Sequence, residues 1–335
     1  MRLFAKTNFD FMGVRKYWIV GSLILNVIGL GVFFGRGVNL GIDFTGGTEV
    51  SLRFATSPDV SAVRSSLERA GLKNPTVTTI GDAKENEVYI RVAEQATPEG
   101  QAAAPADGAS RGRDITRKVL AAIAAPEGTV TIRSQNYVGP SVAPELRQKA
   151  FFAVIASMFA MLAYIWFRFR FQWGLGAILA TIHDVIITLG IYSLSGMEFS
   201  LPVLASFLTL VGYSVNDTIV VFDRIRENMR MRGMTDLHKT INLSINQTLS
   251  RTVITSFLTW IVCVALLFLG GEALHGFAFV LVIGIIVGTY SSIFIASPVI
   301  LFWERLFAGR GKTATVPGRP GGRPGAAKAP AAGRR

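Results

Sequence analysis

The chain has 335 residues, of which half are hydrophobic and 17% charged, and its formal net charge is +12. Six apolar runs of about 20 residues exclude a soluble globular protein and indicate a multi-pass α-helical membrane protein. The runs cover residues 17–35, 150–167, 173–194, 201–222, 252–269 and 277–302.

The first run follows four basic residues within positions 1–16, as the apolar part of a signal peptide would. Its apolar stretch is longer than that of a signal peptide, and the segment 34–37 (FGRG) is a poor cleavage site. We therefore interpret residues 17–35 as an uncleaved first transmembrane helix after a cytoplasmic N-terminus, 1–16.

Arginine and lysine positions predict the orientation of the spans. Basic residues cluster before the first run, after the second and fourth runs, and in the tail after the sixth. The short loops 195–200 and 270–276 contain neither Lys nor Arg. Both termini are therefore expected in the cytoplasm, with the segment 38–149 outside. Since that segment holds 13 basic and 13 acidic residues, the net charge mostly reflects topology and is only weak evidence for nucleic-acid binding, so nucleic acid is not expected as a partner.

The external segment begins with a glycine-rich stretch, 41–47 (GIDFTGG), whose glycines permit tight turns near the membrane. Beyond it, hydrophobic periodicity predicts six elements in the order strand, helix, strand, strand, helix, strand. This order suggests a ferredoxin-like α+β domain. The expected elements are 48–54, 58–71, 75–81, 87–93, 114–125 and 129–137.

Two segments have compositions that disfavour a packed core. Residues 94–110, rich in Ala, Pro and Gly, are predicted to form a flexible insertion in the external domain. Residues 304–335, basic and rich in Gly and Pro, are predicted to form a disordered cytoplasmic tail that contacts anionic lipids. Between the domain and the tail, residues 150–303 are expected to form a five-helix transmembrane bundle.

The fourth apolar run contains a carboxylate, Asp217, whose burial in the hydrocarbon layer costs roughly 2.5–3.5 kcal/mol. Arg251 lies at similar depth on the next helix, roughly 25–28 Å from the outer ends of the two spans. An ion pair would offset both burial costs. Nearby polar groups are expected to support a narrow hydrated path and include Tyr213, Ser214, Asn216 and Thr255.

Two other interpretations of these charges remain open. A static ion pair between Asp217 and Arg251 would only fix the register of the two helices. Alternatively, Arg251 would extend its side chain to the membrane interface. Asp184, in the third run beside His183, has the same ambiguity: a structural hydrogen bond or a step in a proton relay.

Three stretches resemble the SecF family of the bacterial SecD–SecF protein-export system, which is related to the resistance-nodulation-division transporters. They are 41–47, 211–228 and 247–252, and the resemblance covers about residues 1–305. The family motif in the first stretch includes Gly41, Asp43, Gly46 and Gly47.

This resemblance implies a non-enzymatic subunit that uses the proton-motive force to assist Sec-dependent protein translocation across the bacterial inner membrane. Asp217 matches the family's proton-carrying aspartate, and Arg251 its paired arginine. The implied partners are a SecD-like subunit, the Sec translocon channel and the translocating unfolded polypeptide. Neither a cofactor nor a metal is expected.

Three alternatives to the translocation hypothesis remain. A subunit of a proton-driven small-molecule exporter would need a partner to supply its substrate pocket. An intramembrane aspartyl protease would need Asp184 and Asp217 close together, but their depths differ by about 10 Å. A structural scaffold would use the buried charges only to fix helix register.

Overall fold

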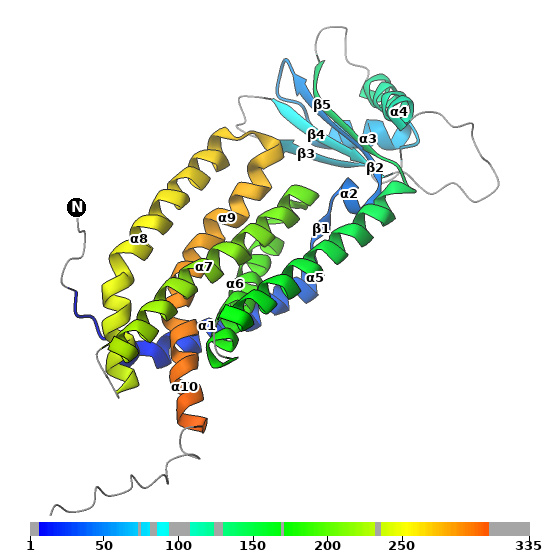
Figure 1. Ribbon diagram of the computed structural model, residues 1–335. Helices are drawn as coiled ribbons and strands as arrows, with labels where there is room; N and C mark the ends of the chain where they lie inside the picture. Colours follow the sequence, from blue (N-terminus) through cyan, green and yellow to red (C-terminus); the bar gives the residue numbers. More distant parts are fainter. Residues whose placement is uncertain are drawn as a thin grey trace, which may run out of the picture.

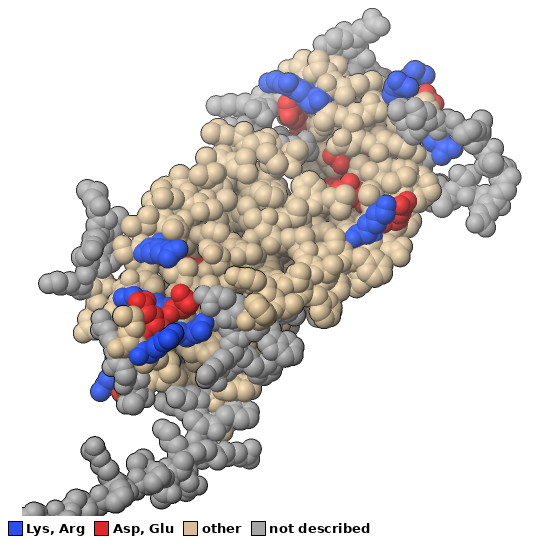
Figure 2. Space-filling model, in the orientation of Figure 1, with Lys and Arg blue, Asp and Glu red and all other residues tan. Residues whose placement is uncertain are grey.

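The computed structural model describes residues 7–72, 75–80, 86–93, 108–123, 130–168, 171–231 and 236–307. A bundle of long helices forms one part of the molecule, and an α/β domain lies at one end of the bundle (Figure 1). In the view of Figure 2, charged side chains gather toward the two ends, and a broad uncharged surface lies between them.

Within the described residues, six helical segments are long and apolar enough to cross a membrane, in agreement with the predicted number of spans. They are α1 (Phe11–Arg36), α5 (Val142–Arg168), α6 (Phe171–Ser195), α7 (Leu201–Met231), α8 (Leu237–Leu269) and the segment from α9 onward. At 31 and 33 residues, α7 and α8 are longer than the ~20 residues that span a bilayer core.

The first helix begins earlier than predicted, so residues 11–16 are helical. The carboxylate of Asp10 accepts a hydrogen bond from the Gly13 backbone N–H at 2.9 Å and caps the helix. A search for apolar residues misses this first turn because a cap is polar and lies outside the hydrophobic run.

The last span contains a π-helical turn. Helix α9 (Glu272–Ser291) continues through η1 (Ser292–Ala296) into α10 (Ser297–Phe307). Turns of this kind insert an extra residue into a helix and occur often at functional sites. Because α10 ends at Phe307, the first residues of the predicted tail, 304–307, are helical; residues 308–335 lie outside the described ranges.

The α/β domain contains the six predicted elements in the predicted order. They are β2 (Gly47–Phe54), α3 (Val60–Arg69), β3 (Thr76–Ile80), β4 (Glu87–Val92), α4 (Gly108–Ile123) and β5 (Val130–Val138). The strands form an antiparallel sheet in the order β3-β4-β2-β5. Helix α4 begins within the segment predicted as a flexible insertion, of which residues 94–107 lie outside the described part of the chain.

Alternating hydrophobic residues build the core of this domain. In β4, Val88, Ile90 and Val92 are buried, and they belong to one cluster with side chains of α3 and α4 such as Leu67 and Val119. Since successive strand residues point to opposite faces, one face of the sheet is covered by the two helices.

Close helix packing in the bundle depends on small residues. A Cβ atom at Gly190 of α6 would lie 2.4 Å from the Gly29 Cα of α1. A Cβ atom at Gly284 of α9 would lie 2.5 Å from a methyl carbon of Leu210 on α7. Gly284 and Gly288 thus form the small-residue pair that allows α9 to approach α7 closely.

A second, small sheet joins the bundle to the α/β domain. Strand β1 (Asn39–Leu40) follows α1 and pairs in parallel with β6 (Glu198–Phe199), which precedes α7. Between β1 and β2 lies the four-residue helix α2 (Ile42–Thr45). The glycine-rich stretch 41–47 therefore lies where the bundle meets the domain.

Substitution of Gly47 tests how closely the chain packs where the bundle meets the domain. Its φ is +135°, and a Cβ atom there would lie 2.5 Å from the Val92 carbonyl oxygen. Gly47→Ala is expected to reduce the free energy of unfolding by roughly 2–3 kcal/mol. Gly71→Ala, at φ +81° in open space, is the matched control and should cost about 1 kcal/mol. Chemical unfolding in detergent measures both values, and equal losses would contradict a steric role for the Val92 contact.

Candidate functional site

Asp217 is the central residue of the candidate site. It lies on α7 within the bundle and is only 7% exposed. Its Oδ2 atom accepts a hydrogen bond of 2.9 Å from the Ser292 hydroxyl, at the start of the π-helical turn. Arg251 and Thr252 of α8 also lie close enough to influence this carboxylate. The buried carboxylate therefore lies between three helical elements, η1, α7 and α8.

The predicted direct ion pair between Asp217 and Arg251 is absent: no ion pair within 4.0 Å joins these two described residues. The Arg251 side chain is exposed, as are Thr255 and Thr259 one and two turns further along α8. The Thr255 hydroxyl donates to the Arg251 carbonyl oxygen at 2.9 Å, so it does not support Asp217. Arg251 thus lies near the carboxylate without a direct contact, and its side chain is on the outward side of α8.

Asp184 forms a second buried centre on α6 and is fully buried. Its Oδ2 atom accepts hydrogen bonds from the hydroxyls of Ser214 (2.5 Å) and Ser291 (2.8 Å). Its Oδ1 atom lies 2.8 Å from Nδ1 of His183. These donors satisfy both carboxylate oxygens without any contact to an arginine or lysine in the described residues.

The hydrogen-bonded chain extends from Asp184 toward α1. Nε2 of His183 lies 2.9 Å from the Tyr290 hydroxyl, which in turn accepts from the Ser22 hydroxyl at 3.4 Å. A proton on Nδ1 of His183 would be donated to Asp184, and Nε2 would then accept from Tyr290. Side chains of three helices, α1, α6 and α9, are thereby connected to one buried carboxylate.

Ser291 and Ser292 connect the two centres because they are adjacent in sequence. Ser291 donates to Asp184 and Ser292 donates to Asp217. The two aspartates share no hydrogen bond with each other among the described contacts, so the site lacks the shared-proton geometry of an aspartyl protease. Any change in the π-helical turn would alter both carboxylate environments together.

The supporting polar residues predicted from sequence have different roles from those expected. The Ser214 hydroxyl donates its hydrogen bond to Asp184 and not to Asp217. Tyr213 packs beside an apolar cluster that contains Tyr192 and Leu210. Asn216 is exposed on α7. Ser291, Ser292 and Tyr290 were missed, although the segment 289–292 (TYSS) is a marked interruption of the sixth apolar run.

The residues of the glycine-rich motif lie at the far end of α7 from Asp217. Oδ2 of Asp43 accepts a hydrogen bond of 2.8 Å from the backbone N–H of Leu201, the first residue of that helix. Sixteen residues separate Leu201 from Asp217, which corresponds to roughly 24 Å along a helix. The motif therefore contacts the helix of the candidate site without contributing to the site itself.

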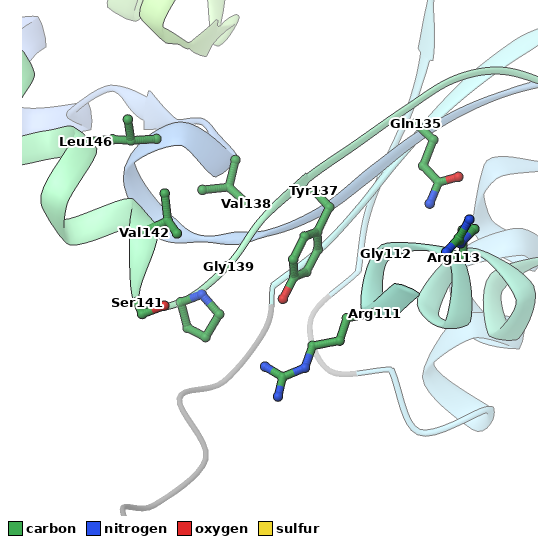
Figure 3. A pocket seen from close by; sticks show the side chains of 11 residues that line it. Arg111, Gly112, Arg113, Gln135, Tyr137, Val138, Gly139, Ser141, Val142 and Leu146 are labelled. Atoms are coloured by element: carbon green, nitrogen blue, oxygen red, sulfur yellow. The ribbon is translucent and has the colours of Figure 1, made fainter. Parts of the chain in front are cut away.

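An open pocket of about 810 Å³ lies on the α/β domain, where α4 and β5 approach the start of α5 (Figure 3). Arg111, Arg113 and Gln135 line one side, and Ser141 and Val142 the other. No Asp, Glu, His or Cys is present among its described lining residues. The pocket therefore lacks an acid–base pair of its own and is separate from the two aspartate centres.

Comparison with known proteins identifies relatives for most of the chain. The model of the C-terminal region of the protein export membrane proteins SecD and SecF matches residues 118–306, and that of the SecD/SecF GG motif matches residues 31–58. Protein translocase subunit SecF of Desulfurispirillum indicum is 43% identical over 88% of this chain and 91% of its own length.

A longer relative has the same region fused to a further one. Protein translocase subunit SecDF of Thermus thermophilus is 40% identical over 89% of this chain but only 39% of its own length. The crystal structure of SecDF from that organism, described as a translocon-associated membrane protein, superposes with a TM-score of 0.78 and 39% identity. The chain covers 40% of the SecDF structure.

Proposed function

The chain belongs to the SecD/SecF family of protein export membrane proteins, and from this premise we propose that it couples proton movement to protein translocation. Its family membership makes it a multi-pass membrane protein that assists protein translocation. The proton-motive force would supply the energy, and Asp217 would bind and release the proton. Arg251 and Asp184 would influence when Asp217 binds and releases this proton.

The burial of Asp217 is the observation that carries the proposal. The carboxylate is 7% exposed within an apolar helix, yet its described partners are the hydroxyls of Ser292, at 2.9 Å, and of nearby Thr252, with no ion pair within 4.0 Å among the described residues. A direct ion pair with a cationic side chain would hold the carboxylate in its charged form. This sparse pairing leaves protonation as an available way to lower the cost of burial.

A SecD-like subunit is the proposed partner. The chain matches two fifths of the fused SecDF relative, and the proposed partner would correspond to the remaining part of that relative. Exposed small and polar residues follow one side of α7, and exposed Arg251 and Thr255 follow α8. Polar side chains facing lipid are costly, so a second membrane protein would cover this face. The α7 residues are Thr209, Gly212 and Asn216.

The remaining features complete this proposal. The α/β domain would be a ferredoxin-like domain on the periplasmic side, and both termini would lie in the cytoplasm of a bacterium with the chain in its inner membrane. The Sec translocon channel and the translocating unfolded polypeptide would be further partners. The basic tail would contact anionic lipids.

Export in the presence and absence of a proton gradient tests the proposal. Cells with or without the chain and its SecD-like partner would export a secreted reporter, and a protonophore would collapse the gradient while ATP is maintained. We expect the chain to speed export only while the gradient stands. The difference between the two strains removes the effect of the gradient on other export steps. An equal gain after collapse would contradict proton coupling.

A further inference from the structure

The glycine-rich motif and Glu198 together form a set of contacts that takes no part in the candidate site around Asp217. Glu198 belongs to β6, three residues before the start of α7. Its partner strand β1 precedes the motif, and the Gly41 backbone N–H donates to the Phe199 carbonyl oxygen at 2.9 Å. We call this set of contacts, made by residues 39–43 with 198–201 and with β4, the junction.

The Glu198 carboxylate contacts the α/β domain directly. Its Oε2 atom accepts a hydrogen bond of 2.5 Å from the Tyr89 hydroxyl of β4. Its Oε1 atom lies 3.8 Å from the Arg91 guanidinium and accepts from the Ile42 backbone N–H at 3.3 Å. Two segments distant in sequence, β4 and the glycine-rich motif, therefore contact one carboxylate of β6 that is only 20% exposed.

Two further contacts reinforce the junction from the domain side. The Arg91 guanidinium donates to the Leu40 carbonyl oxygen at 2.6 Å, so one side chain of the domain binds both strands of the small sheet. Asp43 accepts from the Leu201 N–H at 2.8 Å. An acidic group at a helix N-terminus satisfies a free backbone donor and interacts favourably with the helix dipole.

The chemistry of Tyr89 and Gly41 is consistent with a permanent contact between Glu198 and the α/β domain. Burial and the neighbouring Glu198 carboxylate raise the pKa of the Tyr89 phenol, so this group stays protonated and remains a donor. A Cβ atom at position 41 would lie 2.4 Å from Oε1 of Glu198, so a larger residue there would displace this carboxylate from its present position. The carboxylate thus occupies the space that any larger residue would fill.

We propose that Glu198 and Asp43 are positioning residues that attach the N-terminal end of α7 to the α/β domain. Helix α7 runs without interruption from Leu201 to beyond Asp217. A rigid helix transmits displacement along its axis, so movement of the segment around Asp217 would move the junction and the domain with it. This inference rests on the proposed function, because it assumes that protonation of Asp217 drives the movement.

Hydrogen exchange tests the attachment independently of transport. Tyr89→Phe combined with Glu198→Gln removes the charged hydrogen bond with little change of volume. We expect amide exchange in residues 39–45 to become about tenfold faster, since a charge-assisted hydrogen bond is lost. Exchange in β2 should stay unchanged and would show that the domain remains folded.

Glu87→Gln is the matched control because Glu87 also lies on β4 and forms an ion pair, with Arg133 at 3.1 Å. Its side chain is 19% exposed, against 20% for Glu198, but it contacts neither β6 nor α7 in the described contacts. This variant should leave both exchange at the junction and gradient-dependent export at the wild-type level.

Export measurements then test transmission. In the double variant, the gradient-dependent gain in export should fall about tenfold while the abundance of the chain stays normal. Unchanged exchange in 39–45 would overturn the attachment, and faster exchange with full export would overturn its role in transmission. A wild-type chain without any gradient-dependent gain would instead show that the proposed function itself is wrong.

Discussion

Asp217→Asn should abolish the gradient-dependent gain in export while the chain inserts and binds its partner normally. Asparagine keeps the size of the side chain and can still accept from the Ser292 hydroxyl, but it has no titratable group. Because the buried charge is removed, stability should not fall. The measurement is export of a secreted reporter with and without a protonophore, at matched abundance of the chain.

Asp223→Asn is the matched control for this substitution. Asp223 lies on the same helix, six residues further along, and is exposed. It should retain export, so any loss specific to Asp217 reflects the buried position and not a missing charge on α7. Full gradient-dependent export by Asp217→Asn would exclude this residue as the proton carrier.

Substitutions at Arg251 distinguish a proton relay from a static ion pair with Asp217. A buried pair that loses one partner costs roughly 3–5 kcal/mol, and replacement of both partners by apolar residues restores stability. Since Arg251 is exposed and forms no direct ion pair with Asp217 in the described structure, Arg251→Met should keep normal abundance. The gradient-dependent gain in export should remain absent in the variant with both Asp217→Leu and Arg251→Met; a recovered gain would mean that the two charges serve architecture alone.

Asp184→Leu should be the most destabilising single change in the bundle. Three described donors lose their acceptor: the hydroxyls of Ser214 and Ser291, and Nδ1 of His183. Unsatisfied buried polar groups cost about 1–3 kcal/mol each, so we expect a total loss of roughly 3–5 kcal/mol. Chemical unfolding in detergent gives the free energy, and reduced abundance in cells should accompany it.

Thr188→Val is the matched control for that loss. Thr188 lies one turn further along α6 and is equally inaccessible, but its hydroxyl has no hydrogen-bond partner among the described residues. Its isosteric replacement should change stability by less than about 1 kcal/mol. Similar losses for both variants would mean that the hydrogen bonds of Asp184 contribute little.

Asp184→Asn distinguishes the two roles left open by the sequence. An amide retains the volume and one acceptor oxygen, so a purely structural Asp184 would tolerate it with a modest loss of stability. A relay role requires a titratable group and predicts loss of gradient-dependent export at normal abundance. We expect the second result, because the tandem serines link Asp184 to the same helical turn that binds Asp217.

The sequence alone determined the number of spans and the identity of the two buried carboxylates. Both follow from the bilayer, because a span needs about 20 apolar residues and an ionisable group within it is conspicuous. Alternating apolar residues also determined the order of strands and helices in the α/β domain. Helix ends were less accurate, as α1 and α4 show, because caps and polar first turns lie outside the apolar pattern.

Only the tertiary structure decided which groups meet. The donor to Asp217 lies 75 positions away in sequence, and one donor to Asp184 lies 107 away. Which face of a helix is buried depends on how distant helices pack, so equal depth did not bring Arg251 into contact with Asp217. The same holds for Asp43 and Glu198, whose partners come from segments separated by more than a hundred residues. Such contacts form because packing satisfies buried donors, and a one-dimensional pattern of apolar residues does not contain that geometry.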